Sequence, residues 1–230
     1  QRHQSLRFSL RWVPMKKALI TGASRGIGRA IAEELGKDHH IYAGASKDAS
    51  DVVAALPSAE PFEVDLTDTD AILEAASKIE ELDVLVLAAG VLHKGPFEEL
   101  TDEQWRESMA VNLLAPVALT RAVLPALRRS SGLIIAINSG AGFHGVADNT
   151  AYCASKFALR GFTEALQEEE AGRIRVTSLH PGRTDTDMLA GDDGRPKMDA
   201  AEVAKAARLA VDAGPDAVVE FLRVRPARTS

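Results

Sequence analysis

The stretch Ala18-Leu19-Ile20-Thr21-Gly22-Ala23-Ser24-Arg25-Gly26-Ile27-Gly28 decides the fold of this chain. The apolar run 18–20 predicts a buried strand, and apolar residues at Ile27, Ile31 and Leu35 predict a helix after the glycines. Glycines at this junction allow a tight turn and let backbone N–H groups approach a pyrophosphate at the positive end of the helix. A glycine-rich loop alone also fits a tight turn that binds nothing. Its place between strand and helix favours nucleotide binding.

Strand-like and helix-like patterns alternate along the rest of the chain. Strands are expected at 18–20, 40–43, 61–64, 84–89, 133–138, 174–179 and 217–224. Helices are expected at 27–35, 51–56, 68–79, 101–128, 152–170 and 200–211. Pro116 and Pro125 should divide the helix at 101–128 into two pieces. These repeated units predict a single doubly wound α/β (Rossmann) domain, with a parallel sheet of about seven strands flanked by helices.

The composition limits the class of protein. The chain has 230 residues, 46% of them apolar and 26% charged, which suits one soluble domain with a sizeable core. Its net charge of −6 argues against nucleic acid or an anionic membrane as partner. No run of apolar residues approaches the roughly 18 to 20 that a spanning helix needs. The single cysteine, Cys153, excludes an internal disulfide and fits a reducing compartment, so we expect a cytoplasmic protein.

Residues 1–14 differ in composition from the rest of the chain, because they are basic and contain no acidic residue. We expect a disordered extension outside the fold, with residues 15–230 forming the single Rossmann-fold domain. The composition, rich in Arg and Ser, also fits a targeting peptide.

Tyr152 and Lys156 are four residues apart on the helix expected at 152–170, so their side chains share one face. A neighbouring ammonium group favours the phenolate and lowers the pKa of a tyrosine, which suits proton exchange with a carbonyl or alcohol oxygen. Ser139 follows the apolar run at 133–137 and therefore lies at the C-terminal edge of the sheet, where ligands bind. A Tyr–Lys pair at this spacing also arises by chance, so the surrounding motifs decide its meaning.

A series of motifs resembles the short-chain dehydrogenase/reductase family, in its type of about 250 residues. They are the Thr-Gly-x-x-x-Gly-x-Gly loop at 21–28, Asp65, Ala88-Ala89-Gly90, Asn112, Ser139, Tyr152-x-x-x-Lys156 and Pro181-Gly182-x-x-x-Thr186. The motifs occur in the family's order and spacing, so together they are specific although each alone is not. The resemblance implies an oxidoreductase that transfers a hydride between NADP(H) and a carbonyl compound or a secondary alcohol.

The resemblance also implies the roles of four catalytic residues. Tyr152 would be the general acid in carbonyl reduction and the base in alcohol oxidation, while Ser139 would hold and polarise the substrate oxygen. Lys156 would lower the pKa of Tyr152 and donate a hydrogen bond to the nicotinamide ribose. Asn112, inside the long helix, would anchor a water molecule that links Lys156 to solvent.

A larger set of residues should bind the cofactor. It comprises Gly22, Ser24, Arg25, Gly26, Ile27 and Gly28 in the glycine loop, Ser46 and Lys47 after the second strand, Asp65 and Leu66 at the adenine, Ala89 and Gly90 along the ribose, Tyr152 and Lys156 beside the nicotinamide, and Pro181, Gly182, Thr184 and Thr186 near the carboxamide and phosphates. No metal is expected, because no histidines are paired at a metal-ligand spacing.

The end of the second strand favours NADP(H) over NAD(H). NAD sites usually place a carboxylate there to accept hydrogen bonds from the ribose 2′-hydroxyl, but this chain has Ser46-Lys47 and no acid before Asp48. A carboxylate would repel a 2′-phosphate, whereas serine and lysine would not. Arg25 adds a guanidinium group suited to phosphate recognition. The competing interpretation is that Arg25 and Lys47 are solvated surface charges.

Some residues depart from the family pattern or remain without a role. Leu87 stands where the family usually has an asparagine that stabilises the central sheet, and the sequence at 183–185 is more polar than usual. His93 and His144 fall on loops at the C-terminal edge of the sheet, where either is a candidate for substrate contact. His180 is interpreted as the end of a strand before Pro181.

The polar segment at 187–198 matches the place of the family's substrate loop and is short, which favours a small to medium substrate. In the family, helices corresponding to 101–128 and 152–170 commonly form the subunit interface, so a homodimer or homotetramer is expected. The alternative to an enzyme is a non-catalytic NADP-binding regulator or scaffold. Leu87 and the polar loop after Pro181 support it, and the intact Ser139, Tyr152 and Lys156 oppose it. An epimerase or dehydratase is less favoured, because nothing indicates a sugar-nucleotide site.

Overall fold

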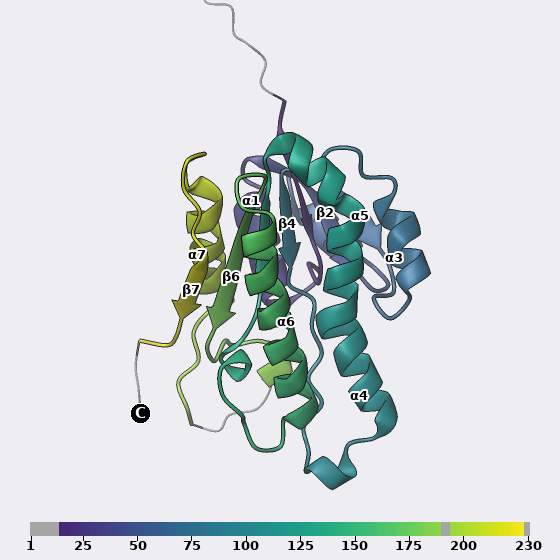
Figure 1. Ribbon diagram of the computed structural model, residues 1–230, viewed down its shortest axis with the longest axis vertical. Coiled ribbons are helices and arrows are strands. Elements are labelled where there is room, and N and C mark those ends of the chain that lie inside the picture. The colour runs from purple at the N-terminus through teal and green to yellow at the C-terminus, as the bar shows by residue number, and fades with distance from the viewer. Residues whose placement is uncertain (1–13, 190–193, 228–230) are drawn as a thin grey trace, which may run out of the picture.

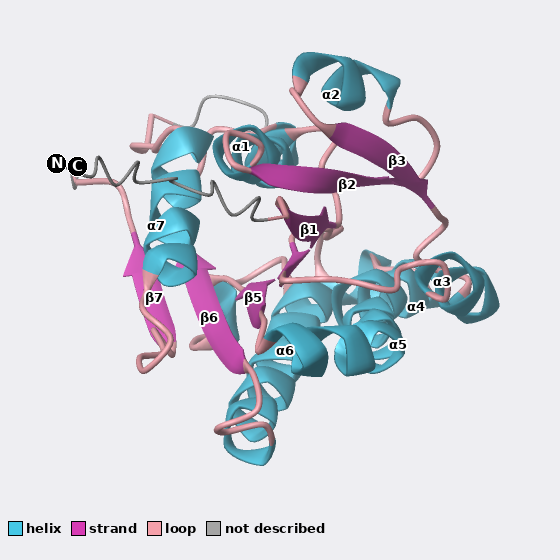
Figure 2. Ribbon diagram, turned by 90° about the horizontal axis from the view of Figure 1, so that it is seen from above, coloured by secondary structure: helices cyan, strands magenta, loops and turns pink. Residues whose placement is uncertain are grey.

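The structure is a computed structural model that describes residues 14–189 and 194–227. Its strands form one parallel sheet in the order β3-β2-β1-β4-β5-β6-β7 (Figure 2). The strands are β1 (Lys16–Ile20), β2 (His39–Ala45), β3 (Ala59–Glu63), β4 (Val84–Leu87), β5 (Leu133–Ile137), β6 (Arg175–Pro181) and β7 (Phe221–Val224). This order confirms the predicted doubly wound fold. The expected disorder of residues 1–13 lies outside the described residues, as do residues 190–193 of the expected substrate loop.

Helices cover both faces of the sheet (Figures 1 and 2). One face carries α1 (Gly26–Leu35), α2 (Ser50–Ala55) and α7 (Ala200–Asp212). The other carries α3 (Thr69–Ala76), α4 (Asp102–Met109), α5 (Ala115–Ser130) and α6 (Thr150–Glu169). Short 3-10 turns are η1 (Phe97–Glu99), η3 (Gly140–Gly142) and η4 (Asp187–Leu189). Two strands are shorter than expected: β4 ends at Leu87, which leaves Ala88 to Gly90 in a loop, and β7 begins only at Phe221.

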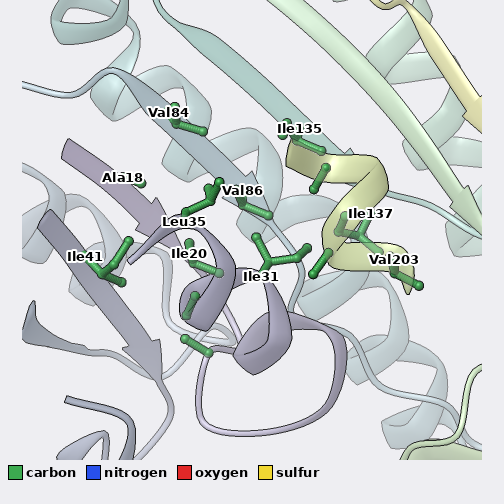
Figure 3. Close-up of a cluster of buried hydrophobic side chains, with 14 of the residues drawn as sticks. Ala18, Ile20, Ile31, Leu35, Ile41, Val84, Val86, Ile135, Ile137 and Val203 are labelled. Carbon is green, nitrogen blue, oxygen red and sulfur yellow. The ribbon is translucent and has the colours of Figure 1, made fainter. Parts of the chain in front are cut away.

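Each strand contributes to two hydrophobic cores because its side chains alternate between the two faces of the sheet. In β1, Ile20 packs toward α1 and α7, whereas Leu19 joins the core under α3 and α5. Figure 3 shows Ile31 of α1 and Val203 of α7 over the strands of the first core. Burial on both faces explains why the central strands are almost wholly apolar.

The long helix consists of two α-helical pieces as predicted, but the prolines do not separate them. A π-helical turn, η2 (Ala110–Leu114), joins α4 to α5, and the helix runs without interruption from Asp102 to Ser130. Pro116 occupies the first turn of α5, where the wider π turn before it leaves room for the ring, and Pro125 lies within the helix. The capping box expected at Thr101 and Gln104 is confirmed.

This continuous helix also qualifies the expectation that no apolar segment reaches the length needed to span a membrane. Asp102–Ser130 is long and apolar enough to do so by length and composition alone. More than half of its apolar window, 56%, is buried inside the protein, as in a core helix that packs on a sheet. Length and composition are therefore weak evidence for a membrane here.

The packing of α1 predicts a large effect of one truncation. Leu35 is fully buried in the core between α1 and the sheet, so Leu35→Ala should lower the free energy of unfolding by about 2–5 kcal/mol. Leu209→Ala, on the exposed side of α7, is the matched control and should change it by about 0.5 kcal/mol or less. Urea unfolding measures both, and equal effects would contradict the core assignment.

Candidate active site

A threonine hydroxyl fastens the end of β1 to the end of β4. Thr21 Oγ1 accepts hydrogen bonds from the backbone N–H groups of Ala88 (3.0 Å) and Ala89 (3.1 Å). The Thr21 N–H in turn donates to the Val86 carbonyl at 3.0 Å. The chain after β1 enters α1, whereas the chain after β4 turns toward the opposite face. The sheet therefore opens a crevice between these two strand ends, as at the ligand sites of doubly wound folds.

The glycines of the loop at 21–28 stand where side chains have no room. A Cβ on Gly22, whose φ is +66°, would lie 2.9 Å from the Ala89 Cα, and a Cβ on Gly28 would lie 2.2 Å from the Gly22 carbonyl oxygen. The loop can therefore press closely against β4 and against the start of α1. The first N–H groups of α1 have no side-chain cap from Arg25. This cradle of open backbone at a helix N-terminus fits the pyrophosphate of a dinucleotide.

Lys156 is the buried cation of the site. Its side chain is 4% exposed, and its Nζ donates to the Ile137 carbonyl at 3.0 Å. Burial lowers the pKa of the ammonium group to about 8, so most of it stays charged at neutral pH. A Cβ on Gly90 would lie 3.9 Å from Nζ, which places the end of the Lys156 side chain beside the loop expected to follow the ribose.

Tyr152 and Ser139 are brought together as predicted, but the pKa of the tyrosine moves the other way. Burial raises the pKa of the Tyr152 phenol above its ordinary value, and a hydrogen bond with Ser139 lowers it only in part. Lys156 Nζ lies 5.7 Å from the centre of the Tyr152 ring, and its observed hydrogen bond is to Ile137. In the chain alone, loss of water around the phenolate dominates this pKa, and the lowering by Lys156 stays a prediction.

Asn112 lies in the π-helical turn, and its side chain is engaged. Its Oδ1 accepts from the Val91 N–H at 2.9 Å, while its Nδ2 donates to the Val91 carbonyl at 3.0 Å and to Ser155 Oγ at 2.9 Å. The side chain therefore holds the loop after β4 to α6. Pro116, four residues later, has no N–H to donate to the Asn112 carbonyl, so the group suited to hold a water is the backbone carbonyl.

The remaining cofactor residues all lie past strand ends at the same edge. Ser46 and Lys47 are exposed after β2, and the Asp48 carboxylate accepts from the Ser50 N–H at 2.8 Å at the start of α2. Asp65, after β3, accepts from the backbone N–H and hydroxyl of Thr67. Among the residues that the structure describes, no hydrogen bond or ion pair joins Ser46 or Lys47 to the glycine loop.

The segment after β6 reaches back to the glycine loop. A Cβ on Gly26 would lie 3.4 Å from Thr186 Cγ2, and Arg25 approaches Asp187 at 4.0 Å with both side chains largely exposed. Gly182 donates its N–H to the Val224 carbonyl at 2.6 Å, and Thr184 is buried. Of the predicted residues that follow β6, Thr186 thus approaches the loop at 21–28.

The structure shows the surroundings of Leu87, His93 and His144, which the sequence left without a role. Leu87 is buried in the core under α3 and α5, and with Leu66 and Val111 it lines a small apolar hollow beside the glycine loop. Its side chain therefore replaces polar sheet contacts with packing. His93 Nε2 lies 2.8 Å from Glu107 Oε2, and His144 is exposed near Gly140. Neither histidine contacts Ser139 or Tyr152 through a hydrogen bond in the described parts of the chain.

His180 is the residue of the site that sequence reasoning missed. It is 1% exposed, and its ring bonds to the backbone carbonyl of Ser139. A histidine at the end of an apolar strand, next to the strand that ends two residues before Ser139, was the available signal. Within residues 14–189 and 194–227, no group of three or more His, Cys, Asp or Glu side chains could hold a metal ion.

The sequence profile of the family described as short chain dehydrogenase matches residues 16–195. This chain belongs to that family. The match includes every strand from β1 to β6 and all four predicted catalytic residues, and leaves only the C-terminal elements outside. The family assignment thus agrees with the crevice between β1 and β4 and with the Ser139–Tyr152–Lys156 cluster.

Known relatives agree with the family assignment. An uncharacterized oxidoreductase of Staphylococcus saprophyticus is 35% identical over 92% of this chain and 97% of its own length. A 3-oxoacyl-[acyl-carrier-protein] reductase of Haemophilus influenzae is 35% identical over 75% of this chain and 76% of its own. Among solved structures, an alcohol dehydrogenase from Thermococcus sibiricus complexed with 5-hydroxy-NADP superimposes with a TM-score of 0.84 and 28% identity, covering 93% of this chain and 97% of the other.

The buried Lys156 predicts a pH dependence of stability. Its pKa in the folded chain, about 8, lies below its ordinary value, so between about pH 8 and pH 10 the unfolded chain binds more protons and stability rises with pH. The free energy of unfolding of the natural protein minus that of Lys156→Met should rise by about 2–3 kcal/mol over this range. Urea unfolding at several pH values, with exposed Lys37→Met as control, measures it. A flat difference would contradict the burial of a charged Lys156.

Proposed function

We propose that this protein is an NADP(H)-dependent oxidoreductase that reduces a ketone or aldehyde, or oxidises a secondary alcohol. The observation that carries the proposal is the half-buried Tyr152 phenol, which interacts with the Ser139 hydroxyl and has the Lys156 ammonium group behind its ring, past the strand ends of the sheet. When bound, the nicotinamide supplies or accepts the hydride. The protein's part is to bind, orient and exchange the proton.

The raised pKa of Tyr152 suits it to act as an acid. A phenol that stays protonated at neutral pH holds a proton ready for the oxygen of a carbonyl as that oxygen gains negative charge. Ser139 Oγ accepts from the Ala141 N–H at 3.1 Å, which leaves its own hydroxyl hydrogen to donate. Ser139 and Tyr152 together can therefore hold one substrate oxygen. In alcohol oxidation, Tyr152 would accept the proton instead.

Lys156 and Asn112 would support this proton transfer. Lys156 uses one of its three N–H groups on Ile137, so the others remain for the nicotinamide ribose and for a proton path. The carbonyl of Asn112 would hold the water that links Lys156 to solvent. Its position is fixed by the clamp that the Asn112 side chain forms with Val91.

Three features support NADP(H) as the cofactor. Arg25 is 77% exposed at the start of α1, and its partner Asp187 lies at the 4.0 Å limit of an ion pair, so a phosphate could displace it. Ser46 and Lys47 are exposed past β2, and Asp48 is occupied by the Ser50 N–H. The Thermococcus sibiricus structure with 5-hydroxy-NADP shows that a similar chain binds such a cofactor. The adenine would rest near Asp65 on the hollow beside Leu66.

For the substrate we propose only a chemical class, and for the assembly only the helices that form the subunit interface. The alcohol dehydrogenase and the oxoacyl reductase among the relatives support a carbonyl or alcohol of small to medium size. Leu114, on the α4–α5 helix, and Phe157, on α6, are exposed and apolar, which supports a homodimer or homotetramer through these helices. A cytoplasmic location remains a proposal that rests on the single reduced Cys153.

Replacing the proton donor tests the reaction. Tyr152→Phe should lower kcat by about 10²-fold to 10⁴-fold while the affinity for NADPH stays close to that of the natural protein, because only the proton is lost. A panel of ketones, aldehydes and quinones, followed by NADPH absorbance, gives the rates, and Tyr42→Phe is the matched control. Persisting turnover would exclude Tyr152 as the acid. Cofactor binding with no turnover of any substrate would favour the non-catalytic alternative.

The cofactor preference has its own test. NADPH should bind more tightly than NADH in fluorescence titrations, and Arg25→Ala should weaken NADPH by about tenfold or more because a charged phosphate contact is lost. NADH affinity should change little. Arg29→Ala, whose guanidinium pairs with Glu33 on the same helix, is the control. A loss of the same size for both cofactors would remove the 2′-phosphate argument and leave the oxidoreductase proposal standing.

A further inference from the structure

His180 lies directly behind the proposed catalytic serine. It is the penultimate residue of β6, and its side chain is 1% exposed. Nδ1 lies 3.2 Å from the backbone oxygen of Ser139, and Nε2 lies 2.7 Å from Ser178 Oγ. Both ring nitrogens of this buried side chain therefore have partners, one at the end of β5 and one within β6.

Chemistry fixes the protonation of this ring. A carbonyl oxygen only accepts, so Nδ1 carries the hydrogen and donates it to Ser139. Nε2 is then the acceptor for the Ser178 hydroxyl. The pKa of His180 is lowered to about 4, chiefly by burial and also by the positive charges of Arg160 and Lys156 on α6, while the hydrogen bond to the Ser139 backbone and the charge of Glu164 oppose the shift. The ring is neutral at physiological pH, with one defined tautomer.

Aromatic contacts hold the ring in this orientation. The Phe143 ring lies 4.6 Å from it and the Phe221 ring, from β7, lies 4.7 Å away. The Arg160 guanidinium covers the Phe143 ring at 4.1 Å. Ring contacts from two separate segments therefore restrict rotation of His180, and Arg160 supports one of them, as expected for a side chain that sets the position of another group.

The turn that carries Ser139 is otherwise held mainly by its own atoms. Asn138 Oδ1 accepts from the Ser139 N–H, Ser139 Oγ accepts from the Ala141 N–H, and the Ser139 carbonyl accepts from the Gly142 N–H at 3.0 Å. These bonds keep the shape of the turn, and the Asn138 N–H ties its start to the Leu179 carbonyl of β6 at 2.7 Å. None of them holds the Ser139 carbonyl to the sheet. The bond from His180 joins the turn to β6, at the residue whose hydroxyl meets Tyr152.

We propose that His180 is a positioning residue for Ser139: its Nδ1–H holds the Ser139 carbonyl so that the hydroxyl meets both Tyr152 and the substrate oxygen. The proposal rests on the function proposed above for Ser139 and Tyr152. It assigns a task to a histidine outside the motifs of the glycine loop and of Tyr152-x-x-x-Lys156. The bond to Ser178 only orients the ring.

Two amide substitutions test the roles of the two ring nitrogens one at a time. In His180→Asn the amide nitrogen takes the place of Nδ1 and keeps the bond to Ser139, whereas in His180→Gln the amide reaches the place of Nε2 beside Ser178. His180→Gln should lower kcat by about 10-fold to 100-fold, because small displacements of a catalytic group are costly. His180→Asn should retain most of the activity, and Ser178→Ala should resemble the natural protein. NADPH affinity and thermal midpoints, measured for all three, show that each is folded.

Equal losses in His180→Asn and His180→Gln would overturn the proposal, as would a loss in Ser178→Ala as large as that in His180→Gln. A second readout needs no turnover. In a Tyr42→Phe background Tyr152 is the only tyrosine, so 3-fluorotyrosine labelling gives a single ¹⁹F resonance that titrates with the Tyr152 phenol.

Because the Ser139 bond lowers the pKa of Tyr152, His180→Gln should raise that pKa and His180→Asn should not. An unchanged titration in His180→Gln would overturn the positioning role by itself. If the pKa of Tyr152 rises in His180→Gln while the natural protein turns over no substrate, the positioning role is supported and only the proposed function is rejected.

Discussion

The close contact between the end of β1 and the end of β4 is the constraint on which the rest of this structure depends. The Thr21 hydroxyl holds the two strand ends together, and Gly22 allows the chain to pass within contact distance of Ala89. A side chain at Gly22 would separate the strands and move the start of α1. The segments that follow β1 and β4 turn to opposite faces of the sheet at this point. The crevice therefore forms where the N-terminus of α1 and the loop after β4 face each other.

Burial, more than pairing of opposite charges, sets the protonation of the groups around that crevice. It lowers the pKa of the Lys156 ammonium group and of His180, and it raises that of the Tyr152 phenol. All three shifts favour the uncharged form, as expected where water is excluded. The result is a neutral Tyr152 phenol, a neutral His180 imidazole and a Lys156 ammonium group whose pKa is close to neutral pH. Groups in these protonation states favour proton transfer.

Patterns that are local in the chain were predicted well. The glycine loop, the apolar strands and the capping box at Thr101 each depend on neighbouring residues, and the structure contains them. The expected breaks at Pro116 and Pro125 did not form: the π turn before Pro116 makes room for that ring, whereas Pro125 lies inside α5 without ending it. By sequence Leu87 is a departure from the family pattern, whereas its neighbours Leu66 and Val111 make it a packing residue.

The sequence by itself determined the order of strands and helices along the chain, and it predicted the edge of the sheet and the residues to which we assign ligand binding and proton exchange. Those properties depend on periodicity, backbone freedom and residue chemistry, which are carried by short segments. Only the tertiary structure decided which side chains are buried from solvent and which atoms are in contact. The rise in the pKa of Tyr152, the clamp of Asn112 on Val91 and the contact of His180 with Ser139 join residues from 21 to 41 positions apart or depend on burial. Such contacts exist only after the sheet has formed, because no local pattern specifies which distant group excludes water from a side chain.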